Sequence, residues 1–242
     1  MRDGRLVAHR GYQRHYPENT LLAIRKAVEA GAAFVETDIQ FSADNQPVLY
    51  HDVFMTRLSG LDEVISQKSL AELAKTPVTE PTRLAEDHGE CVASLVQLVE
   101  YLESVPDVAA FIELKRQSIG LLGTDVVLDT VLRVLEPIRD RAIIISFDIE
   151  AMQAVRQRGW PQVGVVIRDW DQRNSPEVQA VVPDYQFIDI NELPESGTLA
   201  IEQGKLVIYE VADPAIAQGL LARNADMIET FAIGEMITSL AN

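Results

Sequence analysis

The chain has 242 residues, of which 47% are hydrophobic and 24% are charged, which suits a single domain with a large apolar core. Its formal net charge of −16 disfavours binding to nucleic acid or to an anionic membrane surface. The single cysteine, Cys91, excludes an intrachain disulfide and a thiolate metal cage, so a metal site has to use oxygen and nitrogen ligands.

No apolar run approaches the roughly 18 residues that a membrane-spanning helix needs, and the first residues carry no signal-peptide pattern. We therefore predict a cytoplasmic protein without stable membrane insertion. The sequence predicts no particular oligomeric state.

A short apolar strand and a helix open the predicted fold. Residues 6–8 are expected to form a buried strand that ends at His9. The next helix is expected to start at Pro17-Glu18-Asn19-Thr20, with Asn19 as its N-cap, and to end at Gly31. Leu21, Ile24 and Val28 form its apolar face. The strand therefore delivers a histidine to the point where the chain turns from strand to helix.

The second predicted strand carries two carboxylates. It covers 33–41, and the period of two places Glu36 and Asp38 on the same face. Too few residues separate Asp38 from His51 for a parallel crossover, which needs a dozen or more. We therefore predict that 48–51 returns as the antiparallel arm of a hairpin and brings His51 beside Asp38.

Residues 53–108 interrupt this rhythm with loops and short capped helices. Ser69 and Glu72 form one predicted capping box, and Ser94 and Gln97 form another. We predict that this segment is an insertion over the C-terminal face of the strands. A plain irregular connection is the alternative.

From residue 109 onward, predicted strands and helices alternate to the end of the chain. The strands are expected at 109–115, 141–147, 163–167, 187–190, 206–211 and 226–231. The helices are expected at 125–135, 149–158, from Pro176, at 196–203, from Pro214 and at 233–240. Without the hairpin arm the strand count is eight, so the economical fold is an α/β protein of the (β/α)8 TIM-barrel type over residues 1–242, with its active site at the carboxyl ends of the strands.

Acidic residues collect at those strand ends. Glu113 and Lys115 repeat the spacing of two, so both are expected to face the barrel interior. Together with Glu36 and Asp38, Glu113 completes a set of three carboxylates. Such a set without a thiol is typical of a hard oxygen site for Mg²⁺ or Ca²⁺.

Two histidines and two cations accompany the acids. His9 and His51 can transfer protons near neutral pH, and Arg10 and Lys115 can contact an anionic group. This combination is what hydrolysis of a phosphodiester requires, because charge on the phosphate must be neutralised while a nucleophile is activated and a leaving alkoxide is protonated. Either water or a substrate hydroxyl can be the nucleophile. For Lys115, a structural ion pair with Glu36 or Glu113 inside the barrel is the alternative.

The chain resembles the glycerophosphodiester phosphodiesterase family in six motifs that occur in the family's order. They are Ala8-His9-Arg10-Gly11, Pro17-Glu18-Asn19-Thr20, Glu36-x-Asp38, Val48-x-x-His51-Asp52, Glu113-x-Lys115 and Ser146-Phe147. The resemblance implies a barrel with an insertion after the His-Asp motif, and an enzyme that hydrolyses glycerophosphodiesters to sn-glycerol 3-phosphate and an alcohol. It also implies site roles: His9 and His51 as the acid–base pair, Glu36, Asp38 and Glu113 as ligands of Mg²⁺ or Ca²⁺, and Arg10 and Lys115 as contacts to the substrate phosphate.

Two late motifs depart from the family pattern. Tyr209-Glu210 stands where members often have Trp-Thr, and Thr230-Phe231-Ala232-Ile233 replaces a Thr-Asp-x-Pro ending. These changes concern substrate identity more than catalysis. The alternatives are a phosphodiesterase for lysophospholipids or another phosphodiester, and a barrel that binds a phosphate ligand without turnover. The last alternative predicts a missing ligand or histidine, and none is missing.

Overall fold

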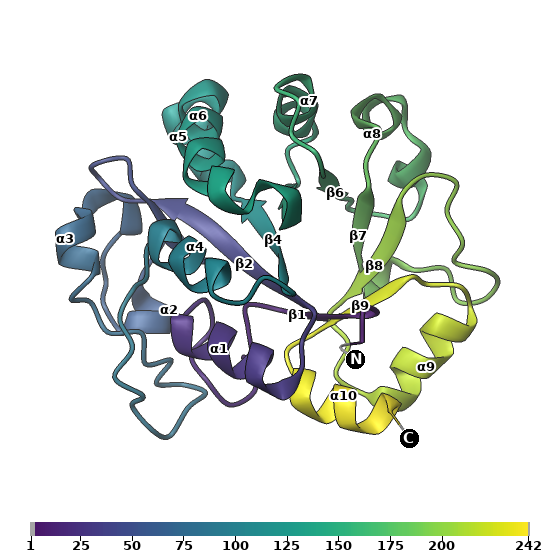
Figure 1. The fold of residues 1–242 in the computed structure, drawn as a ribbon, viewed down its shortest axis with the longest axis horizontal. Helices are drawn as coiled ribbons and strands as arrows, with labels where there is room; N and C mark the ends of the chain where they lie inside the picture. The colour runs from purple at the N-terminus through teal and green to yellow at the C-terminus, as the bar shows by residue number, and fades with distance from the viewer. Residues whose placement is uncertain (1–2, 242) are drawn as a thin grey trace.

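The computed structural model describes residues 3–241, which form a ring of strands surrounded by helices (Figure 1). The strands are β1 (Leu6–Ala8), β2 (Phe34–Phe41), β3 (Pro47–Leu49), β4 (Ala109–Leu114), β5 (Ala142–Ile145), β6 (Gly164–Val166), β7 (Tyr185–Asp189), β8 (Lys205–Tyr209) and β9 (Met227–Thr230). The α-helices are α1 (Leu21–Ala30), α2 (Thr56–Ser59), α3 (Leu70–Leu73), α4 (Leu95–Glu103), α5 (Arg116–Leu122), α6 (Thr124–Leu135), α7 (Ile149–Gln157), α8 (Pro176–Val181), α9 (Pro214–Ala222) and α10 (Ile233–Leu240). Short 3₁₀ turns cover Ile65–Gln67, Glu136–Arg141, Asp171–Asn174 and Ile190–Glu192.

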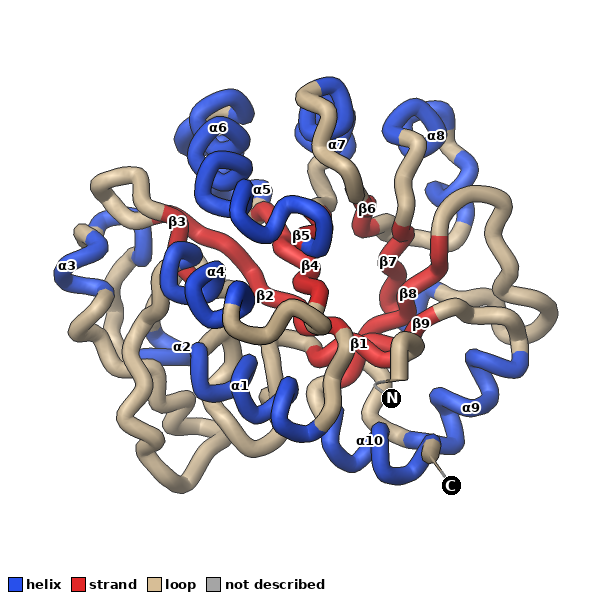
Figure 2. The backbone as a smooth tube through the Cα atoms, viewed as in Figure 1, coloured by secondary structure: helices blue, strands red, loops and turns tan. Residues whose placement is uncertain are grey.

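Apart from β3, the strands run parallel in the order β5-β4-β2-β1-β9-β8-β7-β6 (Figure 2). The two end strands meet through a parallel bridge between Ile144 and Val163. Beside it, the Val166 N–H donates to the Ser146 carbonyl at 2.9 Å. The sheet is therefore a nearly closed eight-stranded barrel, and the predicted (β/α)8 fold is confirmed.

Two apolar layers hold the barrel together. The larger one lies between the strands and the surrounding helices, and the smaller one fills the inside of the barrel. In the inner layer, Phe111 packs edge-to-face against Tyr185 and Phe187 with ring centroids 4.9 Å apart. Because side chains fill this part of the interior, a ligand has room only near the carboxyl ends of the strands.

The hairpin predicted after the second strand is present. β3 pairs antiparallel with β2, and Ile39 lies opposite Leu49. One residue later, the Tyr50 N–H donates to the Asp38 carbonyl at 3.0 Å. This pairing brings His51 back to the middle of β2, as the residue count predicts.

The segment 53–108 contains two kinds of packing. Leu98 and Leu102 of α4 belong to the main core, so α4 is part of the ring of helices. Residues earlier in the segment form a separate apolar cluster with Tyr50 of the hairpin. The single-domain boundary of 1–242 and the role of 53–108 as a cover over the strand ends stay predictions.

The prediction of a helix at 196–203 is wrong. Those residues form an irregular loop in which Gly197 has a φ of +96°, a value that residues other than glycine rarely adopt. The loop is held by a partner distant in sequence, because Arg223 donates to the carbonyls of Gly197 (2.9 Å) and Pro194 (2.6 Å). These hydrogen bonds to a distant guanidinium take the place of the local hydrogen bonds that a helix would form.

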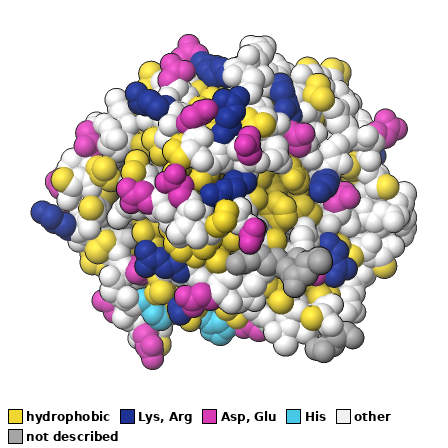
Figure 3. All heavy atoms as spheres, in the orientation of Figure 1, with side chains coloured by type: hydrophobic (Ala, Val, Ile, Leu, Met, Phe, Trp, Pro, Cys, Tyr) yellow, Lys and Arg dark blue, Asp and Glu magenta, His cyan; other side chains and the backbone are white. Residues whose placement is uncertain are grey.

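Charged side chains of both signs are interspersed on the face of the molecule that Figure 3 shows, and apolar side chains gather near its centre. That face therefore offers no continuous basic surface for a polyanion. Among residues 3–241, no helix has the length and apolar character needed to cross a membrane.

Candidate active site

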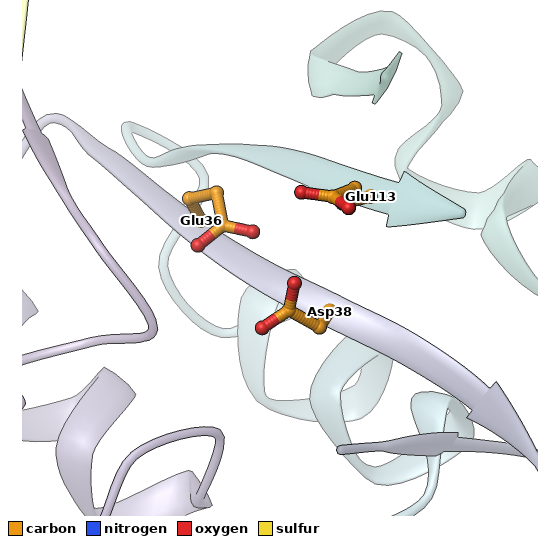
Figure 4. A group of neighbouring side chains, drawn as sticks. All are labelled: Glu36, Asp38 and Glu113. Atoms are coloured by element: carbon orange, nitrogen blue, oxygen red, sulfur yellow. The ribbon is translucent and has the colours of Figure 1, made fainter. Parts of the chain in front are cut away.

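Three carboxylates face one another inside the barrel, as the sequence predicts (Figure 4). Glu36 and Asp38 alternate along β2, and the β2–β4 register places Glu113 directly beside Asp38. One oxygen atom from each of the three side chains lies within 4.8 Å of the other two. Glu36 and Asp38 are buried, whereas Glu113 is partly exposed to the cavity.

The protonation of the three acids depends on their neighbours. Burial raises the pKa of Glu36 well above its usual range, and the charge of Asp38 raises it further. Burial also raises the pKa of Glu113. Burial acts in the same direction on Asp38, but Lys115 and Arg10 hold the pKa of that carboxyl well below its usual range. Additional positive charge is therefore needed before all three groups ionise together.

The residues present fit a divalent cation. Glu36 Oε2 accepts a hydrogen bond from the Arg10 backbone N–H at 3.0 Å, whereas Glu36 Oε1 is buried without a hydrogen-bond partner among the described residues. A buried carboxylate oxygen without a partner is costly. Clustered carboxylates are ligands that Mg²⁺ and Ca²⁺ prefer, so Glu36, Asp38 and Glu113 can hold such an ion.

The two predicted phosphate contacts lie in the cavity wall and form ion pairs with acids. Arg10 Nη1 donates to Glu18 Oε1 at 2.8 Å, and Arg10 Nε lies 3.0 Å from Asp38 Oδ2. Lys115 Nζ lies 2.6 Å from Asp38 Oδ1 and donates to Glu113 Oε1 at 2.7 Å. Lys115 thus forms the ion pair of the alternative interpretation, while its position in the cavity wall leaves it available to an anionic ligand.

Asn19 has a different role from the predicted one. The N-cap of α1 is Thr20, whose hydroxyl accepts from the Ala23 N–H at 3.2 Å. Asn19 has a φ of +55° and points instead toward β2, where its Nδ2 donates to Asp38 Oδ2 at 2.8 Å. Its Oδ1 accepts from the Thr37 hydroxyl at 2.7 Å. The N-cap prediction was therefore wrong by one residue, because this asparagine fixes the orientation of a site carboxylate.

Gly11 lets the chain turn tightly after His9 and Arg10. Its φ is +84°, and a Cβ atom at this position would lie 2.5 Å from the Ala23 carbonyl carbon. We expect Gly11→Ala to lower the free energy of unfolding by more than about 2 kcal/mol, because a positive φ and an overlap with backbone are both unfavourable. Urea denaturation measures this change. Gly120→Ala, in α5 with open space around it, is the control and should change stability little.

His9 is buried against two carboxylates. Its Nε2 lies 4.0 Å from Glu36 Oε2, and its Nδ1 lies 3.4 Å from Glu210 Oε1 without forming a hydrogen bond. Burial, and secondly the charge of Arg10, lower the pKa of His9 to about 3. The imidazole is therefore neutral at neutral pH.

His51 is partly exposed, and its side chain pairs with the carboxylate of Asp52. Its Nδ1 lies 2.6 Å from Asp52 Oδ1, and Arg57 donates to both oxygen atoms of Asp52. Arg57 also donates to Glu18, at 2.8 and 2.9 Å. Burial would raise the pKa of Asp52, but its hydrogen bonds to His51 and Arg57 lower that pKa below the usual range. An ionised Asp52 can stabilise an imidazolium at His51.

These side chains line a cavity of about 130 Å³ at the carboxyl ends of the strands. It contains six of the seven predicted site residues, namely His9, Arg10, Glu36, His51, Glu113 and Lys115, and Asp38 lies directly behind them. Glu229 also lies in the wall and was not predicted from the sequence, whereas Tyr209, another member of the wall, was noted only as a departure from the family pattern. Glu229 carries a signal that could have revealed it, because it is the only charged residue of the buried strand β9.

The fold and the site define a (β/α)8-barrel protein with an acidic, histidine-containing site at the carboxyl ends of its strands. The chain belongs to the glycerophosphoryl diester phosphodiesterase family, whose model matches residues 9–208.

Three similar proteins illustrate the range of the match. A human glycerophosphoinositol inositolphosphodiesterase is 39% identical over 33% of this chain, but the alignment spans only 15% of that relative. A glycerophosphodiester phosphodiesterase from Bacillus altitudinis is 26% identical over 72% of this chain and 70% of its own length. The solved structure of an Oleispira antarctica phosphodiesterase in complex with the product sn-glycerol-3-phosphate has a TM-score of 0.82 and 19% identity, and covers 98% of this chain and 97% of that one. The last similarity concerns the fold.

Proposed function

We propose that this protein hydrolyses glycerophosphodiesters to sn-glycerol 3-phosphate and an alcohol. The observation that carries the proposal is the convergence of three acids, two histidines and two cations on one small cavity. Membership of the family supports the same reaction, and the Oleispira relative was solved with this product.

Glu36, Asp38 and Glu113 would hold a divalent ion, Mg²⁺ or Ca²⁺, in this proposal. When bound, the ion supplies positive charge that stabilises negative charge on the phosphoryl oxygens. Arg10 and Lys115 lie in the same wall and add charge-assisted hydrogen bonds to the non-bridging oxygens. The protein thus stabilises the charge that builds up during hydrolysis.

His9 is proposed as the general base and His51 as the general acid. His9 lies in the cavity wall beside Glu36, where a ring nitrogen can face the proton of an attacking water molecule. His51 is about one-third exposed and also lines a second, more open hollow with Phe54 and Gln117. This position allows it to protonate an alcohol that departs outward, while Asp52 stabilises its charged form.

A panel of phosphodiesters tests the proposal. The purified protein is incubated with glycerophosphocholine, glycerophosphoethanolamine and lysophosphatidylcholine in the presence of Mg²⁺, Ca²⁺ or Mn²⁺. We expect the two glycerophosphodiesters to release sn-glycerol 3-phosphate, detected by phosphorus NMR spectroscopy. Release of phosphocholine and glycerol, or faster cleavage of lysophosphatidylcholine, would contradict the proposal.

A further inference from the structure

Glu229 is a buried acid that the reaction described above does not use. It lies in β9 beside Val7 of β1, and its side chain forms part of the cavity wall. Only 3% of the residue is exposed to solvent. Its Oε1 has no hydrogen-bond partner, and no ion pair joins its carboxyl group to another residue in the described part of the chain. A carboxyl group in this environment is costly unless a ligand satisfies it.

A metal-binding role does not explain Glu229. The acids of residues 3–241 that approach one another closely enough to share an ion are Glu36, Asp38 and Glu113, and Glu229 is not one of them. Burial, and secondly the charge of Glu113, raise the pKa of Glu229 well above its usual range. In either protonation state, a carboxyl group can accept a hydrogen bond from a hydroxyl. Such a group suits a neutral hydroxyl partner.

The wall of the cavity that Glu229 lines also contains apolar side chains. Val166, Phe187 and Ile145 line it, and Tyr209 adds a ring with a hydroxyl group. A small polyol matches this mixture, because its C–H groups can pack on the apolar side chains while its hydroxyls reach the polar ones. A volume of about 130 Å³ has room for a group of the size of glycerol.

We propose that Glu229 hydrogen-bonds a hydroxyl of the glycerol moiety and thereby selects phosphodiesters that carry an unacylated glycerol. This inference rests on the proposed function and adds a specificity-determining residue to it. It also gives the substrate a direction in the barrel: the glycerol lies inward against β9, and the alcohol to be released lies outward near His51.

Binding of two product-like ligands tests the inference without relying on turnover. Calorimetry compares sn-glycerol 3-phosphate with propyl phosphate, which lacks both hydroxyls, in the presence of Mg²⁺. We expect wild-type protein to bind sn-glycerol 3-phosphate at least about 10-fold more tightly, since a site built for a hydroxyl rejects an analogue without it. Glu229→Leu should weaken binding of sn-glycerol 3-phosphate about 10- to 100-fold and that of propyl phosphate less than about 3-fold.

Glu229→Gln is the matched control, because its amide keeps the shape and can still hydrogen-bond a hydroxyl. It should retain most of the preference for sn-glycerol 3-phosphate, and the wild-type comparison of the two ligands tests the inference if Glu229→Leu does not fold. Equal wild-type affinity for the two ligands, or an equal loss for both in Glu229→Leu, would overturn the inference. A wild-type protein that prefers sn-glycerol 3-phosphate but cleaves no glycerophosphodiester would contradict the proposed function and support the inference.

Discussion

Replacing His51 with alanine is expected to lower kcat for glycerophosphocholine about 10²- to 10⁴-fold, which is the usual contribution of a general acid. The protein should remain folded, because His51 is partly exposed and Asp52 keeps its hydrogen bonds to Arg57 after the imidazole is removed. We expect the free energy of unfolding to change by less than about 1 kcal/mol. Steady-state kinetics and urea denaturation measure the two effects on the same preparation.

The leaving group distinguishes the role of His51 from that of His9. An ester of glycerol phosphate with p-nitrophenol releases a weakly basic phenolate that needs no proton. On this substrate His51→Ala should recover most of its lost activity, whereas His9→Ala should not, since a general base is still required. His88→Ala is the control, because His88 lies outside the cavity wall. Equal losses of His51→Ala on both substrates would disprove its assignment as the acid.

The sequence predicts the positions of the site residues well where regular strand geometry determines which way their side chains point. The strand period of two places Glu36 and Asp38 on one face, and the parallel register of β2 and β4 brings Glu113 beside them. The count of residues in the hairpin is enough to return His51 to the same region. These predictions depend only on local spacing and on a fold with one dominant topology, so little tertiary information was needed.

The predictions fail where contacts with residues distant in sequence determine the local conformation. Asn19 is a good N-cap by local rules, but hydrogen bonds to Thr37 and Asp38 of β2 take it into the site and leave the capping role to Thr20. The helix expected at 196–203 is replaced by a loop whose carbonyls accept from Arg223. Neither partner is adjacent in sequence, and helix propensity contains no term for such contacts.

Roles of buried side chains are harder still to predict than their positions. The sequence shows Glu229 between Ile228 and Thr230, but its proposed role depends on a side-chain oxygen, Oε1, that has no hydrogen-bond partner among the described residues. Lys115 illustrates the converse, since its two ion pairs emerge only when Asp38 and Glu113 are placed around it. Burial and pairing are properties of the assembled barrel, because side chains from β2, β4 and β9 contribute to the same cavity.

Substituting Glu36 with glutamine is expected to separate metal binding from folding. The glutamine carbonyl can still accept the hydrogen bond from the Arg10 N–H, so the local structure should persist. The substitution removes an acid whose burial and whose neighbour Asp38 oppose its ionisation, so the metal-free protein should be as stable as wild type or more stable. Activity should fall about 10³-fold, since loss of a metal that stabilises charge in the transition state costs several kcal/mol.

Thermal denaturation with and without the ion provides the measurement. At an ion concentration about 100-fold above Kd, wild-type protein should gain about 2.7 kcal/mol, which raises the Tm of a domain of this size by roughly 5–10 °C. Glu36→Gln should show no such shift, and Glu100→Gln, at an exposed position on α4, should behave as wild type. Full activity of wild-type protein after chelation by EDTA would show that the reaction needs no metal ion. A normal Tm shift in Glu36→Gln would show that these three carboxylates do not form the metal site, because an ion held by them must lose affinity when one ligand loses its charge.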